Sequence, residues 1–264
     1  SDDKIYQIEN KKGNITILSN FGSIHPINIE KLNIFAKKYD NLFYILWYWI
    51  NLPTPFKYWV HTFQEYKLEP YKEPYKNRYL TYKQYENENK YIPYRFSSFV
   101  NPETNFIELN NNKDIDIIYI GSIYERQILQ SINNNKNYNT FIHAINWEGK
   151  YITGNEFINL YRRSKICLGL MSKGNIDCNT VTERIWEAFS FGCLVLTNSK
   201  TAEIVTDGAA VYYSNYQDLL NKIDYYLSNK DEYMKKIEKG YNIFTSYGNY
   251  KYNANEFVNY LNNI

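Results

Sequence analysis

The sequence predicts an α/β fold in which parallel strands alternate with helices. Short apolar runs of strand length recur along the chain, and amphipathic segments of about ten to fifteen residues separate them. Both features are clearest between residues 114 and 227. A parallel sheet of this kind binds its ligands in the crevice beyond the carboxyl ends of its strands. We therefore expect functional residues to follow the predicted strands directly.

The first half of the chain shows fewer elements. Residues 14–20 and 41–50 are apolar runs that predict two strands, and residues 90–102 predict a third strand that leads into a linker. Prolines interrupt a tyrosine-rich segment between them, and its pattern predicts no element. We expect a reduced N-terminal α/β domain of residues 1–110 and a C-terminal domain of residues 111–264. The last helix is a candidate to cross back to the first domain.

The second half alternates regularly between apolar runs and amphipathic segments, which is typical of βαβ units. The predicted strands are residues 114–122, 139–145, 165–171, 193–197 and 209–214. The predicted helices are residues 123–132, 153–164, 180–192 and 215–229, followed by two more helical segments before residue 264.

Composition excludes several classes of protein. The net charge is only +2, which argues against a nucleic-acid partner, because such proteins usually carry a strongly basic face. The three cysteines are odd in number and lack metal-ligand spacing, so they indicate a reducing compartment, and we expect a cytoplasmic protein. No apolar run reaches the roughly 20 residues of a membrane span. The tyrosine-rich segment suits homo-oligomer contacts or glycan stacking, and the sequence leaves both open.

Residues 179–198 carry the densest chemical signals in the chain. Thr180 and Glu183 have the spacing of a capping box, which predicts a helix with Thr180 as its N-cap. Glu183 and Glu187 lie four residues apart and share one face of that helix. Gly192 ends the helix before an apolar strand. On packing alone, Glu183 is a cap and Glu187 a surface acid. The predicted inward face consists of Ile185, Ala188 and Phe189.

The start of this helix also has the features of an anion site. It follows a polar loop, residues 171–180, and free backbone N–H groups at a helix start bind phosphate. Arg184 can pair with the same phosphate, and an acid one turn deeper can accept two ribose hydroxyls. This combination predicts a site for a nucleotide sugar.

Two segments carry a resemblance to a known family. The stretch TERIWEAFSFGCLVLTN presents Arg184, Trp186, Glu187, Ala188 and Gly192 in the order Arg-x-aromatic-Glu-Ala-x-x-x-Gly. This stretch resembles the donor-binding domain of GT-B glycosyltransferases, nearest to the spore-maturation-type group (glycosyl transferases group 1-like). The stretch DIIYIGSIYER resembles the first donor-domain strand of that group. The matching residues in this second stretch are Gly121, Ser122 and Arg126.

The resemblance covers residues 114 to about 227 and implies a GT-B-like fold with two Rossmann-like parallel-sheet domains. It implies that Glu187 binds the ribose and that Arg184 and residues 180–182 lie near the diphosphate. Retaining members often carry an earlier Glu, and Asn179 stands in its place here. A weaker resemblance links NTVTERIWEA to the Thr-Glu-Lys motif of α1,3-fucosyltransferases, which would make Glu183 the ribose ligand. The choice between the two acids stays open.

Other residues complete the expected site. His25 lies in the loop after the first predicted strand, which faces the donor in a GT-B cleft, so it is the candidate general base. Asp114 and Asp116 form an Asp-x-Asp motif, but they precede their strand, at the wrong end for a ligand-facing metal site. We expect no metal and no cofactor, because Arg, Lys and helix N-termini can stabilise a departing diphosphate. The candidate donor-binding residues are Gly121, Ser122, Arg126, Lys173, Asn179, Thr180, Thr182, Glu183, Arg184 and Glu187.

These features predict a glycosyltransferase (a hexosyl- or deoxyhexosyltransferase) that moves a sugar from a nucleoside-diphosphate sugar to an acceptor hydroxyl without a metal. The acceptor would be a glycan, lipid or protein. The alternative is a non-catalytic module that keeps the fold and binds a nucleotide sugar or a glycan, or serves in assembly.

Overall fold

The computed structural model describes two parts of the chain at different levels of detail. It describes the strand backbones of residues 4–10, 13–21, 42–47, 58–62 and 91–94, and it describes residues 113–122, 125–144, 152, 154–177, 181–249, 251–252, 255 and 259. The chain divides into two compact units. Unit 1 comprises residues 1–65, 70–96 and 254–264, and unit 2 comprises residues 66–69 and 97–253. The domain limits predicted from the sequence stay a prediction.

Unit 1 contains a five-stranded sheet in the order β1-β2-β3-β4-β5. β1 pairs with β2 in the antiparallel direction, and the other neighbours are parallel. The strands are β1 (Lys4–Asn10), β2 (Gly13–Phe21), β3 (Leu42–Trp47), β4 (Tyr58–Thr62) and β5 (Tyr91–Tyr94). The predicted strands at 14–20, 41–50 and within 90–102 are confirmed as β2, β3 and β5. β1 and β4 were not predicted.

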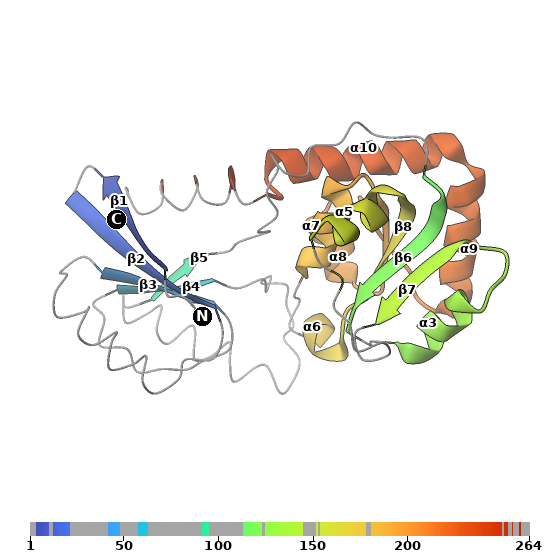
Figure 1. Ribbon diagram of the computed structural model, residues 1–264, viewed down its shortest axis with the longest axis horizontal. Coiled ribbons are helices and arrows are strands. Elements are labelled where there is room, and N and C mark those ends of the chain that lie inside the picture. The colour runs from blue at the N-terminus through green and yellow to red at the C-terminus, as the bar shows by residue number, and fades with distance from the viewer. Residues whose placement is uncertain are drawn as a thin grey trace. The chain divides into compact units, whose positions relative to one another are not determined.

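Unit 2 is a parallel sheet with helices on both faces, as Figure 1 shows. Its strands are β6 (Ile115–Gly121), β7 (Thr140–Ala144), β8 (Ser164–Gly169), β9 (Leu194–Thr197) and β10 (Ala210–Tyr212). Its helices are α3 (Arg126–Asn133), α5 (Gly154–Arg162), α6 (Lys173–Asp177), α7 (Glu183–Ser190), α8 (Lys200–Val205), α9 (Tyr216–Ser228) and α10 (Lys230–Ser246). All five strands predicted for this region are confirmed. The short helices α6 and α8 were not predicted.

The strand order of unit 2 places a switch point between β6 and β8. The sheet runs β10-β9-β8-β6-β7, so the chain passes from β6 to β7 on one side and then returns to β8 on the other side of β6. The connections that leave β6 and β8 therefore diverge. In doubly wound sheets this point opens a crevice outside the carboxyl ends of the two strands, and ligands bind there.

Alternate residues of the central strand β6 serve the two faces of the sheet. Ile118 and Ile120 belong to the apolar core under α5, α7 and α8, whereas Ile117 and Tyr119 belong to the core under α3 and α9. β6 is buried on both faces, which explains its nearly continuous apolar sequence. The predicted inward residues of α7, Ile185, Ala188 and Phe189, are all buried.

Helix α10 packs closely against α7 because two glycines leave room for aromatic rings. A Cβ atom at Gly240 would lie 2.5 Å from Phe189 Cδ1, and one at Gly248 would lie 2.7 Å from Trp186 Cε3. Both contacts are shorter than van der Waals distance, so a larger residue at either glycine would push the two segments apart. The packing of α10 fixes the buried side of α7, whose other side faces the crevice described below.

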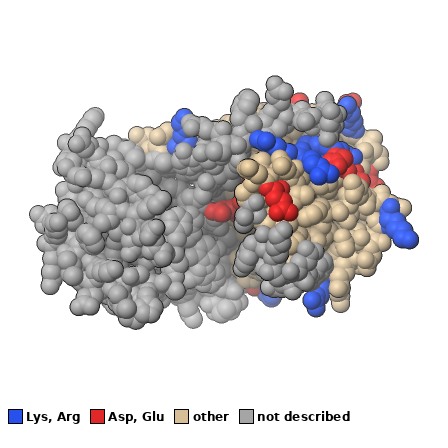
Figure 2. All heavy atoms as spheres, in the orientation of Figure 1, with Lys and Arg blue, Asp and Glu red and all other residues tan. Residues whose placement is uncertain are grey.

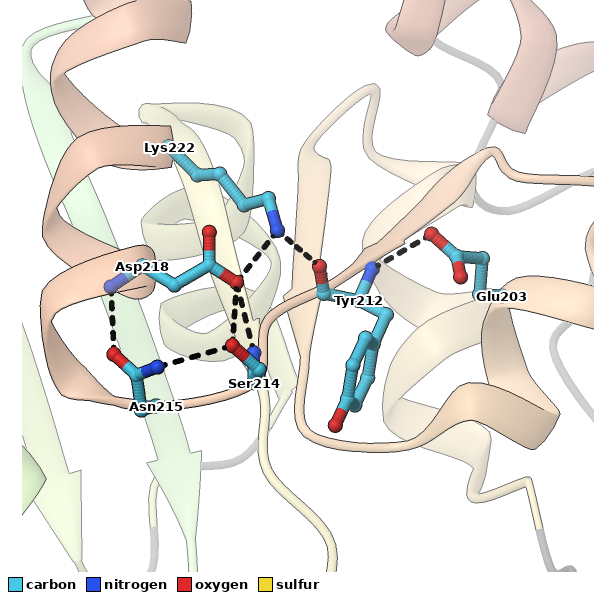
Figure 3. Close-up of polar contacts among 6 residues, drawn as sticks. All are labelled: Glu203, Tyr212, Ser214, Asn215, Asp218 and Lys222. Carbon is cyan, nitrogen blue, oxygen red and sulfur yellow. Dashed lines mark hydrogen bonds and ion pairs between the residues drawn. The ribbon is translucent and has the colours of Figure 1, made fainter.

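Side chains form hydrogen bonds with the backbone of the edge strand β10, as Figure 3 shows. The Tyr212 backbone N–H donates to Glu203 Oε1 at 3.2 Å, and Lys222 Nζ donates to the Tyr212 carbonyl at 2.7 Å. Lys222 also pairs with Asp218 at 2.8 Å. These contacts satisfy backbone groups that an edge strand would otherwise offer to another chain.

Basic and acidic side chains are interspersed over the face drawn in Figure 2. Among the described residues, no helix combines the length and the hydropathy needed to cross a bilayer.

Candidate functional site

Arg184 lies at the switch point and links its two strands. Its Nε donates to the carbonyl of Ile120 near the end of β6, at 3.2 Å. Its Nη1 donates to the carbonyl of Leu170, directly after β8, at 2.9 Å. Since β6 and β8 are neighbours, one guanidinium group bridges the carboxyl ends of the two strands that flank the crevice. This position could not be read from the sequence, which shows only an Arg in the first turn of a helix.

Gly121 makes room for this guanidinium. A Cβ atom at position 121 would lie 2.0 Å from Arg184 Nη2, so any side chain there would displace the Arg. The sequence suggested Gly121 only as part of a turn. The structure shows that the glycine lets the third guanidinium nitrogen lie directly beside the backbone at the end of β6.

Tyr119 packs against the guanidinium group of Arg184. The centroid of its buried ring lies 4.7 Å from the guanidinium carbon of Arg184, within the range of a cation–π contact. The Tyr119 hydroxyl donates to the carbonyl of Ser122 and so ties the turn after β6 to the strand. Tyr119 was not predicted as a site residue, because an aromatic residue in an apolar strand gives no signal beyond packing.

Glu183 and Glu187 occupy the same side of α7, one turn apart, as predicted. Burial, together with the nearby Glu183 carboxylate, raises the pKa of the Glu187 carboxyl to about 7, although the Arg184 guanidinium opposes both effects. Burial also raises the pKa of Glu183. Both raised pKa values show that the charged carboxylates are disfavoured. Without a ligand, α7 therefore holds two acids where water solvates them poorly.

Several polar side-chain groups on the first two turns of α7 lack protein partners in the described part of the chain. There the carboxylates of Glu183 and Glu187 accept no hydrogen bond, Arg184 donates to two carbonyls but forms no ion pair, and the buried Thr182 Oγ1 has no hydrogen-bond partner. Buried polar groups without partners cost free energy and cluster at functional sites. The arrangement offers a cation to an anionic ligand and carboxylates to its hydroxyls.

The predicted start of α7 is wrong. The helix begins at Glu183 and its N-cap is Thr182, which has φ −79° and ψ 156° and makes no side-chain cap bond. Glu183 is therefore the first helical residue and not the third, as a cap at Thr180 would require. Val181 is buried, and the chain runs extended through Thr182 to place that side chain in the core. The predicted residues Asn179 and Thr180 lie outside the described residues.

The polar loop after β8 is held by Asn198. Its Oδ1 accepts from the Met171 backbone N–H at 2.9 Å, and its Nδ2 donates to the Met171 carbonyl at 3.0 Å. The loop then forms the short helix α6. Lys173, a predicted diphosphate ligand, begins α6 with an exposed side chain and pairs with Asp177. Asn198 was not predicted as a site residue, because its contact is made across the sheet.

The turn after β6 carries two more predicted residues. Ser122 is exposed, and Arg126 is exposed as the first residue of α3. The residue before it, Glu125, has the left-handed conformation with φ 52°. Nearby strand β10 leads into Tyr213, whose buried hydroxyl has no hydrogen-bond partner in the described part of the chain. His25, the candidate base, lies outside the described residues.

Asp114 and Asp116 lie at the amino edge of the sheet, as their place before and at the start of β6 requires. Asp114 accepts from Arg163 Nε at 2.8 Å, and Asp116 pairs with Lys165 at 2.7 Å. Both acids thus serve in ion pairs near the start of β8. Among the described residues, no three His, Cys, Asp or Glu side chains gather closely enough to hold a metal ion.

The fold and this site define a class of protein: a doubly wound α/β protein whose switch-point crevice presents an Arg and unpaired acids at a helix start. The fold agrees with that of a sucrose-phosphate synthase from Thermosynechococcus elongatus, which is 11% identical with a TM-score of 0.54, over 90% of this chain and 77% of that chain. T4 phage BGT in complex with UDP and Mn²⁺ is 15% identical with a TM-score of 0.48, over 89% of this chain and 85% of that chain.

The family described as glycosyl transferase-like matches residues 122–259, more than half of the chain. The chain belongs to this family, and the predicted α/β, GT-B-like fold class is confirmed. A search of the curated proteins gives no match.

Proposed function

We propose that the chain transfers a sugar from a nucleoside-diphosphate sugar to an acceptor hydroxyl. Membership of a glycosyltransferase-like family supports glycosyl transfer in general. The observation that carries the donor proposal is the unpaired cation and acids in the first turn of α7, beside the carboxyl ends of β6 and β8. A diphosphate and a ribose supply the groups that these side chains lack.

The residues at and near the start of α7 have separate roles in this proposal. The Nη2 of Arg184, which is free of hydrogen bonds within the described residues, binds the diphosphate together with the backbone N–H groups at the start of α7. The Glu187 carboxylate accepts the ribose hydroxyls. Thr182 Oγ1 adds a hydrogen bond to a phosphate oxygen. Lys173, once released from Asp177, and Arg126 lie on the adjoining connections and add positive charge.

The reaction breaks the bond between the anomeric carbon and the diphosphate oxygen and forms a bond to the acceptor oxygen. The leaving diphosphate gains negative charge, which Arg184 and the helix N–H groups stabilise without a metal. The acceptor hydroxyl loses its proton to a general base, and we propose His25 for this role. We also propose that Asn179 and Thr180, in the loop before α7, contact the donor.

The cellular setting belongs to the same proposal. Cys167 and Cys193 are buried free thiols, which suits a reducing compartment, and we propose the cytoplasm. A glycan, a lipid or a protein provides the acceptor hydroxyl.

Thermal melting against UDP, GDP, CDP, dTDP and their sugars, with and without EDTA, tests the donor and the metal together. A ligand that binds only the folded protein raises the melting temperature. We expect one nucleotide to stabilise the chain and EDTA to leave that shift unchanged. A shift abolished by EDTA would contradict metal independence, and no shift with any nucleotide would favour the non-catalytic module.

A further inference from the structure

A cavity of about 290 Å³ lies in unit 2 at the amino edge of the sheet, far along the strands from the switch-point crevice. Lys113 precedes β6, Lys165 is the second residue of β8, and Phe191 and Gly192 precede β9, so the floor comes from the amino ends of three strands. The described residues that line the cavity are Lys113, Lys165, Phe191, Gly192, Tyr226, Leu227, Lys230, Tyr233, Met234 and Ile237.

The walls are apolar and come from the corner between α9 and α10. Tyr226 and Leu227 close the end of α9, and Met234 and Ile237 lie on the first turns of α10. Tyr233 is held in place by its hydroxyl, which donates to the Lys165 carbonyl at 3.3 Å. Small-molecule sites are concave and mostly apolar, with volumes from about 300 Å³, so this cavity suits a small ligand.

The charged side chains of the described cavity lining are all cationic. The described lining contains three lysines and no Asp or Glu. Lys113 Nζ donates to three carbonyls, those of Ser164 and Gly192 at 2.8 Å and of Phe191 at 3.0 Å, so its N–H donors are used. Lys165 pairs with Asp116 at 2.7 Å.

Lys230 differs from the other two lysines. It is exposed at the first position of α10 and has no partner among the described residues. Its three ammonium donors are available at the rim of the cavity. Lys113 adds positive potential behind it, which favours an anion and opposes a cation, whereas Asp116 offsets the charge of Lys165.

We propose that this cavity binds an amphiphilic organic anion. The aromatic or aliphatic body of the ligand packs against Tyr226, Met234 and Ile237, and its carboxylate, sulfonate or phosphate group pairs with Lys230. The site is separate from the donor crevice, and its occupation does not depend on the glycosyl-transfer proposal.

The probe for this site is 8-anilino-1-naphthalenesulfonate, an aromatic anion whose fluorescence rises in apolar surroundings. Titration of the full chain is expected to show one saturable site that excess UDP or GDP does not remove. Lys230→Glu reverses the charge and should weaken binding roughly tenfold or more, because a charge-assisted contact is lost. A Glu at the first position of α10 suits the helix dipole, so this variant should fold.

Two controls decide the outcome. Lys235→Glu makes the same charge change on α10 at a residue outside the cavity and should alter the affinity less than about twofold, since exposed charges are screened. Met234→Trp fills the cavity and should abolish the saturable signal. The proposal is overturned if the dye does not saturate, if nucleotides displace it, or if Lys230→Glu and Lys235→Glu weaken it equally.

Discussion

Arg184 is a charged side chain held by backbone carbonyls, and the charge is not neutralised by any described acid. Its two hydrogen bonds fix the guanidinium at the ends of β6 and β8 while leaving Nη2 beside Gly121. Glu187 lies one turn away with a raised pKa. The residues of the site are therefore organised before any ligand arrives, at a cost to the free energy of unfolding.

Burying the charged carboxylate of Glu187 costs free energy, and this cost should be measurable as a dependence of the free energy of unfolding on pH. Its pKa rises from the ordinary 4.5 to about 7, so the folded state binds more protons than the unfolded state between these pH values. Stability contributed by this group is present below pH 4.5 and is lost as the pH rises to 7. Glu187→Gln removes the charge and should raise the free energy of unfolding by about 1–3 kcal/mol at pH 8, and by much less at pH 5.

Urea unfolding of both proteins at the two pH values measures this effect. Glu238→Gln, at an exposed position of α10, is the matched control and should show no such difference between pH 5 and pH 8. Equal stabilities of wild type and Glu187→Gln at pH 8 would show that Glu187 is solvated in the folded protein.

Gly121 and Arg184 should be energetically coupled. Gly121→Ala places a Cβ atom 2.0 Å from Arg184 Nη2 and should destabilise the fold by about 1–3 kcal/mol. In an Arg184→Ala background the same change should cost less, because the obstacle is gone, while the cost of a non-glycine residue at φ 155° remains. A double-mutant cycle by urea unfolding tests this, and additive effects would mean that the two residues do not share the space.

At the scale of elements, α7 is held at its carboxyl end by Lys113 and at its buried side by α10. Lys113 donates to the carbonyls of Phe191 and Gly192, just beyond the last helical residue, and to that of Ser164 in β8. One side chain thus joins the end of the helix to the neighbouring strand. The first turn of α7 carries the candidate ligand groups, so fixing the rest of the helix also fixes them.

Replacing Lys113 should loosen this junction. Lys113→Met keeps the apolar stem and leaves three carbonyls without their donor, which should lower the free energy of unfolding by about 1–3 kcal/mol. Lys235→Met, at an exposed position on α10, should change the free energy of unfolding far less, because its surface ion pair with Glu232 contributes little. Urea unfolding of the wild type and the two variants measures this difference. Equal losses of unfolding free energy in both variants would show that Lys113 does not hold the end of α7.

Some elements could be predicted from the sequence and others could not. β6 and β8 are continuous apolar runs because they are buried on both faces, and such runs are visible in one dimension. β1, with the sequence KIYQIEN, neither alternates polar and apolar residues nor forms a continuous apolar run, so it gave no clear signal. α6 and α8 have only five and six residues, too short for a helical period to appear.

The segment that holds the candidate site could be predicted from the sequence, but the contacts between its residues could not. Arg184, Glu183 and Glu187 stood out because two acids and an Arg follow a polar loop after a strand. The bridge from Arg184 to Ile120 and Leu170 depends on residues 64 and 14 positions away in sequence. The start of α7 was predicted wrongly because Thr180 and Thr182 are both good cap residues, and burial of Val181 decided between them.

At the scale of the whole molecule, a GT-B-like fold supplies the crevice and the family supplies the class of chemistry. The particular residues determine how the crevice responds to its surroundings. If the ionised carboxylate of Glu187 accepts the ribose hydroxyls, as we propose, its pKa of about 7 without ligand means that donor binding should release a proton near neutral pH.

The affinity for the stabilising nucleotide should therefore rise with pH between about 6 and 8 and level off above that. Isothermal titration calorimetry at three pH values, in buffers of different ionisation enthalpy, measures both the affinity and the proton release. Affinity that falls over this range would indicate that the protonated form of Glu187 binds the donor.

The most direct test of the central claim is the affinity of Glu187→Ala for the nucleotide that stabilises the wild type. If the first turn of α7 binds the ribose of the donor, calorimetry should show a loss of roughly tenfold or more, since a charge-assisted contact is removed. Circular dichroism and melting should show that the variant remains folded. Unchanged affinity in that folded variant would contradict the assignment of Glu187 and, with it, our account of the site.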